Sequence, residues 1–392
     1  MLPFYICCLL IYVPYFLFES SDLFHIALKF SVKEHAIYGL LPVGIVLLGG
    51  AAARPWRKNA SVQGYYASSW VRLLLWGVMI FSLAAQLIQI AVALTGFLAG
   101  GYLVARQAAV FEGVGTIIRM DIVALPLLAA VLRNRKVILR LLGLLAIMHV
   151  GRAFLMSERV AIVEVVCVAW IVLPLCGVKG IPIRKGAIGG ALVVILFSML
   201  LSARLDQQSQ AGGRFDSTAT GILDSVWAYY SDTMNKYYQV ASGDFEYPGV
   251  FALAPVGALL GWEGARALDY KSLLEQLESS SSMINSGLNN PGGLAQDVSD
   301  FGILGYFVII LKFLIMSYIW KRRFSSLVCL ALAPLILISI LEYPRFNYLS
   351  MPFAAYLLVF SVVIGFVVKR AAVRREVDAA RFELSQKGEG AA

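Results

Sequence analysis

Uninterrupted apolar stretches recur along the chain, and they constrain its fold more than any other feature of the sequence. Residues 187–201 and 351–368 contain no charged residue and approach the roughly 20 residues that a helix needs to cross a bilayer. In hydrocarbon every backbone N–H and C=O needs an internal partner, so helices are the default for such stretches. Only 15% of the 392 residues are charged, against about a quarter in a soluble domain. The sequence therefore predicts an all-α polytopic membrane protein.

Five short basic clusters punctuate these stretches and predict the topology. Positive charge near the ends of membrane helices stays on the cytoplasmic side. If all five clusters lie inside, each interval between them contains an even number of crossings. Because the net charge of +9 is divided among these clusters, we expect no nucleic-acid partner. The clusters are Arg54, Arg57 and Lys58; Arg133, Arg135, Lys136 and Arg140; Lys179, Arg184 and Lys185; Lys321, Arg322 and Arg323; and Lys369, Arg370, Arg374 and Arg375.

The apolar stretches predict about ten helices. Both termini then lie in the cytoplasm, with an N-terminal bundle over 1–202, C-terminal helices over 300–368 and a basic tail over 369–392. The five cysteines all fall in apolar stretches without ligand-like spacing, which indicates packing residues and not a disulfide or zinc framework. The expected helices lie near 1–18, 37–53, 70–96, 117–132, 137–155, 160–177, 187–202, 300–320, 325–341 and 351–368.

A long polar segment, residues 203–299, interrupts the helices and lies outside by the same parity. It carries five Lys or Arg against eleven Asp or Glu, a net charge of −6. Loops of this length usually carry function. Within the segment, 217–241 has the spacing of an amphipathic helix, and 247–262 fits an interfacial or re-entrant helix.

The first candidate site is a tight outside hairpin that contains Arg152, Glu158 and Arg159. On a continuous helix the two arginines, seven residues apart, would share a face at the membrane boundary. Guanidinium groups fixed there suit a diphosphate, which they grip through paired N–H donors. In the alternative interpretation the arginines extend to lipid headgroups or pair with Glu158.

The second candidate site is the aromatic run from Trp227 to Tyr238. Its aromatic faces, beside amide, carboxylate and amine groups, suit sugar rings, although Tyr and Trp also gather at membrane interfaces without binding a ligand. The third lies around Asp297 and Asp300, which either cap the next helix, act as a general base or bind a metal. Arg345, in the last outside turn, could reach the same anion as Arg152.

Other ionisable residues lie within or near the predicted spans. Arg119, Asp121, Glu164 and Lys312 are the main ones, and such groups are costly in a membrane and functional by default. The sequence nevertheless indicates no chain of Asp, Glu and His through successive helices of the kind a proton relay needs. The three histidines form no metal-ligand pattern.

Three of these features occur together in a known family. They are the Gly151-Arg152 hairpin, the tyrosine pairs Tyr229-Tyr230 and Tyr237-Tyr238, and an Asn-Pro-Gly stretch that leads into Asp300-Phe301-Gly302. With the ten-helix layout they resemble bacterial O-antigen polymerases, the Wzy-type oligosaccharide repeat-unit polymerases. The resemblance is clearest over about residues 150–320.

The resemblance implies a GT-C-like inner-membrane glycosyltransferase whose active site faces the periplasm. Such enzymes transfer a growing glycan from undecaprenyl diphosphate to a new lipid-linked repeat unit, without metal or cofactor, alongside a flippase and a chain-length regulator. The resemblance also implies roles for individual residues. Arg152, Arg159, Arg214 and Arg345 would bind the diphosphate; Asp300, Asp297 or Glu158 would be the base; Trp227, Tyr230, Lys236, Tyr237 and Asn290 would line the glycan path.

Two other functions are compatible with the same layout. An O-antigen ligase or other lipid-linked-sugar glycosyltransferase is one, although a ligase is expected to place a histidine in the large outside loop and residues 203–299 contain none. A polysaccharide or lipid transporter is the other. Transporters often have matched halves and polar groups near the midplane, whereas the polar residues here are concentrated at one face.

Overall fold

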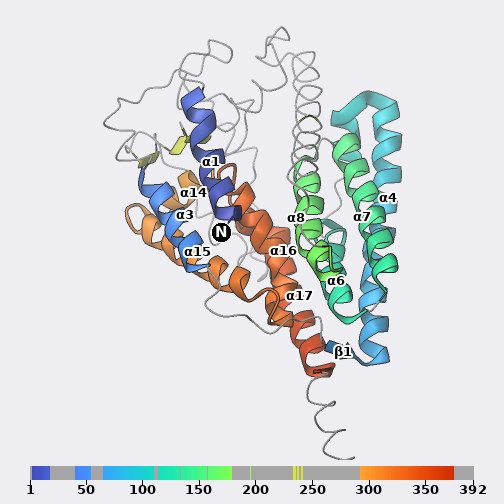
Figure 1. Cartoon of the computed structure of the whole chain (residues 1–392). Helices are drawn as coiled ribbons and strands as arrows, with labels where there is room; N and C mark the ends of the chain where they lie inside the picture. Colours follow the sequence, from blue (N-terminus) through green and yellow to red (C-terminus); the bar gives the residue numbers. More distant parts are fainter. Residues whose placement is uncertain are drawn as a thin grey trace, which may run out of the picture.

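The computed structural model describes residues 2–17, 40–53, 65–109, 114–132, 134–156, 158–178 and 292–374, with Ile195 and residues 233–234, 236–237 and 240–241. Figure 1 shows that these residues are mostly helical. One antiparallel pair joins β1 (Tyr65–Ala67) to β2 (Ala372–Arg374), and a 3-10 turn, η5 (Tyr348–Ser350), precedes the last helix. The helices are α1 (Leu2–Leu17), α3 (Leu40–Ala52), α4 (Ser69–Ala108), α5 (Val114–Ile117), α6 (Met120–Val131), α7 (Arg135–Met156), α8 (Val160–Leu175), α14 (Gly293–Phe301), α15 (Leu304–Arg322), α16 (Leu327–Glu342) and α17 (Pro352–Ala371).

Helices occupy nine of the ten predicted positions. The tenth, 187–202, lies outside the described residues apart from Ile195. Within the described ranges, five segments are long and apolar enough to cross a membrane, and α3, α8 and α16 are shorter apolar helices. The prediction of an α-helical membrane protein is confirmed, whereas the number of crossings and the side occupied by 203–299 remain predictions. The five segments are Ser69–Gly101, Val114–Val131, Arg135–Met156, Leu304–Arg322 and Phe353–Ala371.

α4 extends beyond residue 96, where the sequence predicts its end. The helix runs to Ala108 and departs from helical geometry only at Gly100 and Gly101. Gly101 has φ 77°, a left-handed conformation that glycine adopts without steric cost. Two consecutive glycines therefore form a kink in α4, and the chain returns to helical geometry beyond it.

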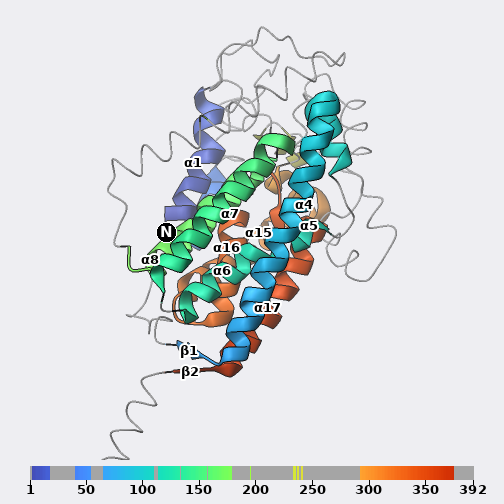
Figure 2. The ribbon, with the colours of Figure 1, turned by 90° about the vertical axis from the view of Figure 1, so that its right-hand side faces the viewer.

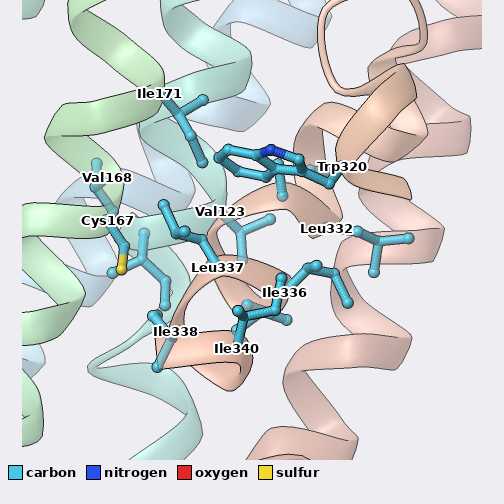
Figure 3. Close-up of a cluster of buried hydrophobic side chains, with 14 of the residues drawn as sticks. Val123, Cys167, Val168, Ile171, Trp320, Leu332, Ile336, Leu337, Ile338 and Ile340 are labelled. Atoms are coloured by element: carbon cyan, nitrogen blue, oxygen red, sulfur yellow. The ribbon is translucent and has the colours of Figure 1, made fainter. Parts of the chain in front are cut away.

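α16 forms the core of the bundle. In Figure 1 it lies between α1, α3 and α15 on one side and α6, α8, α7 and α4 on the other. Nearly every residue of α16 is buried, as expected for a helix that is apolar on all sides. Figure 3 shows its side chains packed against those of three neighbouring helices, including Val123 of α6, Ile171 of α8 and Trp320 of α15.

The outer helices present large apolar side chains to the surroundings. Leu73 and Ile80 of α4 and Phe307 and Leu311 of α15 are all exposed. Exposed apolar patches of this extent mark an interaction surface, and on helices of this length the matching environment is lipid.

The β1–β2 pair distinguishes the two ends of the bundle. β1 immediately precedes α4 and β2 immediately follows α17, so the start of α4 and the end of α17 meet at one end, which we call the β end (Figure 2). Because short connections join α15, α16 and α17, the α15–α16 connection also lies there. The guanidinium of Arg119, at the start of α6, lies over the ring of Phe353, at the start of α17. The α6–α7 connection therefore lies at the β end as well.

Basic residues are concentrated at the β end. Arg135 and Lys136 start α7, Lys321 and Arg322 end α15, and Lys369 lies in the last turn of α17. The described parts of three predicted basic clusters thus share one end of the molecule, although the side of the membrane that this end faces stays a prediction. At the other end, which we call the distal end, α7 finishes and α6, α8 and α17 begin.

Candidate functional site

A cluster of ionisable side chains is buried at the distal end. We call it the ion cluster, and its members come from α6, α7, α8 and the connections that precede α6 and α8. Ionisable groups in a membrane domain are costly unless they are paired, and they mark functional sites by default. The members are Arg119, Asp121, His149, Arg152, Glu158 and Glu164.

Arg119 connects the start of α6 to α8. Its Nε donates to Glu164 Oε1 at 2.5 Å, and its Nη2 donates to Glu158 Oε1. Nη1 donates to the Gly115 carbonyl at 2.9 Å, and the guanidinium lies 4.4 Å from the centre of the Phe353 ring. Hydrogen bonds between charged groups are about twice as strong as neutral ones, so Arg119 is fixed in place.

Arg152, in the last turns of α7, is fully buried. Its Nη2 donates to Glu158 Oε2 at 2.6 Å, and its Nη1 lies 3.8 Å from Glu164 Oε2. Within the described residues, Nε and Nη1 of Arg152 have no hydrogen-bond acceptor. The side chain therefore has donors available for a further anionic group.

Arg152 and Arg159 do not lie on one continuous helix as the sequence predicts. α7 ends at Met156 and α8 begins at Val160, with Glu158 between them. The residues that join two antiparallel helices must reverse the chain, so the seven-residue spacing sets no common face. The alternative, in which Arg152 pairs with Glu158, is confirmed. Arg159 is buried, and its charge acts on Glu342 at the end of α16.

His149 lies between two carboxylates. Its Nε2 is 3.3 Å from Asp121 Oδ2, and its Nδ1 is 3.1 Å from Glu164 Oε2. Asp121 also accepts a hydrogen bond at 2.5 Å from Nε2 of Gln86 on α4. A chain of Asp, His and Glu thus runs across α6, α7 and α8. The prediction that no such chain exists is wrong. The sequence pattern does not reveal the chain, because its members are at least 15 residues apart.

Glu158 is the part of the ion cluster that reaches the surface, with 21% of its side chain exposed. Burial raises the pKa of this carboxyl, but the neighbouring charges of Arg119 and Arg152 outweigh burial and hold the pKa below its ordinary value. Glu158 is therefore ionised at neutral pH and neutralises two arginines. A competing anion would have to take its place.

The α16–α17 connection completes the distal end. Arg345, predicted to approach the anion bound by Arg152, lies 3.0 Å through its Nη1 from Glu342 Oε2. Tyr348 donates to Glu164 Oε1 at 3.2 Å, which joins this connection to the ion cluster. Arg152, Arg159 and Arg345 are thus all buried at the same end of the bundle.

Asp297 occupies a second polar site, on α14. Lys312 Nζ lies 2.5 Å from its Oδ1, the Tyr343 hydroxyl donates to its Oδ2 at 2.7 Å, and Asn347 Nδ2 donates to Oδ1 at 3.3 Å. The prediction that Asp297 caps the following helix is wrong. Asp297 lies inside α14, and α15 begins only after Gly302, whose positive φ of 54° separates the two helices.

The structure describes only some of the other predicted site residues. Asp300 is half-buried near the end of α14. Lys236 is fully buried, as is Tyr237, whose hydroxyl lies 2.9 Å from that of Tyr306 on α15. A role for Tyr237 in stacking on a sugar would need its ring to be uncovered. Arg214, Trp227, Tyr230 and Asn290, as well as the segment 247–262, lie outside the described residues.

The predicted amphipathic segment 217–241 is described at six positions, all of them helical. Met234 and Tyr237, which the helical spacing puts on one face, are both buried. Thr233 and Lys236 are buried too, so the protein covers more than one face of this segment. Its burial beside α15 brings part of 203–299 into the bundle.

No match to this chain is found among protein-family models, among curated proteins or among solved structures. The geometry of the ion cluster and of the Asp297 site is therefore the basis for a functional proposal.

Metal binding is a separate question from anion binding. Across the described ranges, no group of three or more His, Cys, Asp or Glu side chains is arranged to hold a metal ion. The spacing of Asp297 and Asp300 suggested a metal site. Asp297 instead binds Lys312 and Tyr343.

Sequence reasoning did not join Asp121, His149 and Glu164. Each of these side chains was recognisable as a costly ionisable group in or beside an apolar span. Their contacts depend on how α6, α7 and α8 pack, which no local pattern in the sequence specifies. A search for buried ionisable residues near the same end of successive spans would have found them.

Proposed function

We propose that this protein is a membrane glycosyltransferase that polymerises undecaprenyl-diphosphate-linked oligosaccharide repeat units on the periplasmic side of the bacterial inner membrane. The observation that carries the proposal is the position of the buried arginines. They lie at the distal end, opposite the basic β end that the charge rule assigns to the cytoplasm. A lipid-linked diphosphate meets an enzyme at such a boundary.

Arg152 is the central residue for binding the diphosphate. Its Nε and Nη1 have no acceptor among the described residues. These two donors point to different sides of the guanidinium, so each would donate to a separate phosphate oxygen. In the absence of substrate Glu158 neutralises Arg152 and Arg119. The diphosphate would replace Glu158, and fixed cations would stabilise the charge that develops as the glycan leaves.

The three candidate bases differ in their surroundings. Asp297 accepts hydrogen bonds from Lys312, Tyr343 and Asn347, so both of its oxygens are already engaged. Glu158 is held in the same way by two arginines. Asp300, half-buried near the end of α14, is the candidate that we place first.

Substitution of Arg152 tests this function. Arg152→Ala should abolish long glycan chains on a gel of surface polysaccharide, while single-repeat products remain. Arg140→Ala, an exposed arginine on the same helix nearer the β end, is the matched control and should keep the full ladder. Loss of chain extension in both variants, or in neither, at equal protein level would contradict the proposal.

A deletion strain separates polymerase from ligase, the first alternative. Single-repeat products attached to the lipid core identify a polymerase. A lipid-linked polymer that never reaches the core identifies a ligase, and in that case the diphosphate site remains but the acceptor changes.

The second alternative, a polysaccharide or lipid transporter, gains support from one observation. A buried Asp121–His149–Glu164 chain inside a membrane domain is a common component of proton-coupled transport. Purified protein in vesicles distinguishes the two functions. Synthesis of polymer from lipid-linked repeat units supports the enzyme, and movement of intact lipid-linked sugar without new linkages supports the transporter.

A further inference from the structure

The Asp121–His149 pair has a property that is independent of glycan chemistry. Asp121, His149 and Glu164 are all fully buried. Asp121 and His149 lie in segments that are long and apolar enough to span a membrane, and Glu164 lies in the shorter apolar helix α8. Both ring nitrogens of His149 lie within ion-pair distance of a carboxylate oxygen, Nε2 at 3.3 Å and Nδ1 at 3.1 Å, although the Nδ1 contact is not aligned as a hydrogen bond. A neutral imidazole carries one N–H only, whereas an imidazolium carries two.

The environment of Asp121 determines how many protons the pair holds. Gln86 Nε2 donates to Asp121 Oδ2, and the Asp121 backbone N–H donates to Ser82 Oγ. Among the described residues, His149 provides the only cationic group within ion-pair distance of Asp121. A fully buried carboxylate is stable only when it is paired and hydrogen-bonded, so the charge on this pair depends on whether His149 supplies the cation.

Glu164, unlike Asp121, has a cationic partner other than His149. Arg119 Nε donates to its Oε1, and the Tyr348 hydroxyl reaches the same oxygen. Its remaining oxygen, Oε2, faces His149 Nδ1 and is 3.8 Å from Arg152 Nη1. Glu164 is therefore ionised, and its negative charge favours a proton on His149 Nδ1. His149 Nε2 then lies 3.3 Å from Asp121 Oδ2 and 3.5 Å from Gln86 Nε2, which also donates to Asp121 Oδ2, and His149 Nε2 and Asp121 Oδ2 are left to share a second proton.

We propose that Asp121 and His149 form a buried proton-binding site, which holds one proton between Asp121 Oδ2 and His149 Nε2 at neutral pH. In proton uptake the carboxylate–imidazole pair takes one H⁺ from water, and no other bond within the protein forms or breaks. The proton resides on the ring, as a carboxylate–imidazolium pair, or on the carboxyl, as a neutral pair. In both forms a hydrogen atom lies between Asp121 Oδ2 and His149 Nε2.

The groups that face this site come from every helix packed around it. α4 contributes the neutral side chains Gln86 and Ser82, and α8 contributes Glu164. On its own helix, His149 has Arg152, whose positive charge opposes a charged ring. Since Glu164 is bound to Arg119, loss of the proton would repel the carboxylates and disturb the arginines of the ion cluster. Proton binding is thus coupled to the distal end through Glu164.

Nuclear magnetic resonance of ¹⁵N-histidine-labelled protein in nanodiscs tests the site. Full-length protein with His25→Asn and His35→Asn retains His149 as its single histidine. At neutral pH we expect either two protonated ring nitrogens, or a neutral ring together with a protonated carboxyl band in the infrared spectrum. Asp121→Asn should remove the infrared band or return the ring to its neutral form, and Asp300→Asn is the matched control that should change neither.

Two results would overturn the proposal. One is a neutral His149 ring with no protonated carboxyl at neutral pH. The other is an imidazolium or carboxyl signal that persists unchanged in Asp121→Asn. If that variant fails to accumulate, the double histidine variant decides the question alone, because its ring and carboxyl signals report the bound proton directly. Neither result depends on polymerase activity, so the site and the proposed function fail or succeed separately.

Discussion

At the scale of single residues, the distal end is organised by carboxylates that each bind at least two partners. Glu158 joins Arg119 to Arg152, and Glu164 joins Arg119 to His149. Removal of one member of such a network leaves its partners buried and unpaired, which costs more than the lost hydrogen bond itself. Glu158 is the most informative member, because it is partly exposed and lies outside the helices.

Glu158→Gln should lower the stability of the folded protein by about 1–3 kcal/mol at neutral pH, because two arginines lose an ionic partner. The pKa of Glu158 is depressed in the folded state. Its stabilising effect is therefore complete above its ordinary pKa of about 4.3 and is lost as the pH falls through the lower folded value. Thermal unfolding in detergent should show the gap between wild type and variant closing toward acid pH. A gap that stays constant over that range would contradict the assignment.

At the scale of secondary-structure elements, α14 is held against the α16–α17 connection by close backbone contact. The Gly292 and Gly293 amides donate to the carbonyls of Arg345 and Tyr343, at 2.9 Å and 3.0 Å. A Cβ added at Gly293 would lie 2.6 Å from the Tyr343 carbonyl oxygen. The absence of a side chain therefore sets how closely Asp297 approaches Tyr343.

Gly293→Ala should destabilise the protein by about 1–3 kcal/mol, the usual cost of overpacking, and should weaken the Asp297–Tyr343 contact. Gly143→Ala is the matched control, because a Cβ added there meets nothing within 4 Å. Because Gly143 lies inside α7, its replacement by alanine should raise the stability of the folded protein by about 0.5–1 kcal/mol. Thermal unfolding of both variants measures the difference. Equal stabilities would show that α14 can move away from Tyr343 without cost.

The elements also show what a sequence can and cannot predict. Apolar run length predicted α7, α8 and α17 closely, because burial in lipid needs only composition and length. It missed the boundary between α14 and α15, which depends on the positive φ of Gly302. It also missed the continuation of α4 past Gly101. Both features are local backbone conformations that leave no periodic signal.

The candidate site was only partly predictable for a related reason. Arg152, Glu158 and Arg159 were found because they are neighbours in sequence near a predicted membrane boundary. Asp121, His149 and Glu164 were each noticed and left unconnected, because their contacts join three helices. Asp297 was found as a carboxylate, but its donors come from later parts of the chain, Lys312 from α15 and Tyr343 and Asn347 from the α16–α17 connection.

At the scale of the whole molecule, the sorting of charge between the two ends predicts orientation. The β end carries exposed basic residues at the start of α7, whereas the distal end carries buried ion pairs. The positive-inside rule therefore predicts that the β end lies in the cytoplasm and the distal end on the opposite side of the membrane.

Single introduced cysteines test that orientation. Lys136→Cys lies at the β end and Ile303→Cys, at an 85% exposed position, lies between α14 and α15 at the distal end. With a membrane-impermeant thiol reagent on intact spheroplasts, Ile303→Cys should react and Lys136→Cys should react only after permeabilisation. The native cysteines are buried, so wild type gives the background. The reverse labelling pattern would invert the topology and remove the basis for periplasmic glycan assembly.

The length of α4 gives the depth at which the ion cluster lies. Seventeen residues separate Ser69, where α4 begins, from Gln86, which contacts Asp121. At about 1.5 Å per residue this is a rise of about 25 Å, in a hydrocarbon layer about 30 Å thick. If α4 starts at one membrane surface, Asp121 and His149 lie just beneath the opposite one. Headgroup phosphates and water are then only a few ångströms away, so both a proton and an anionic lipid can arrive from the far side without crossing the bilayer's oily interior.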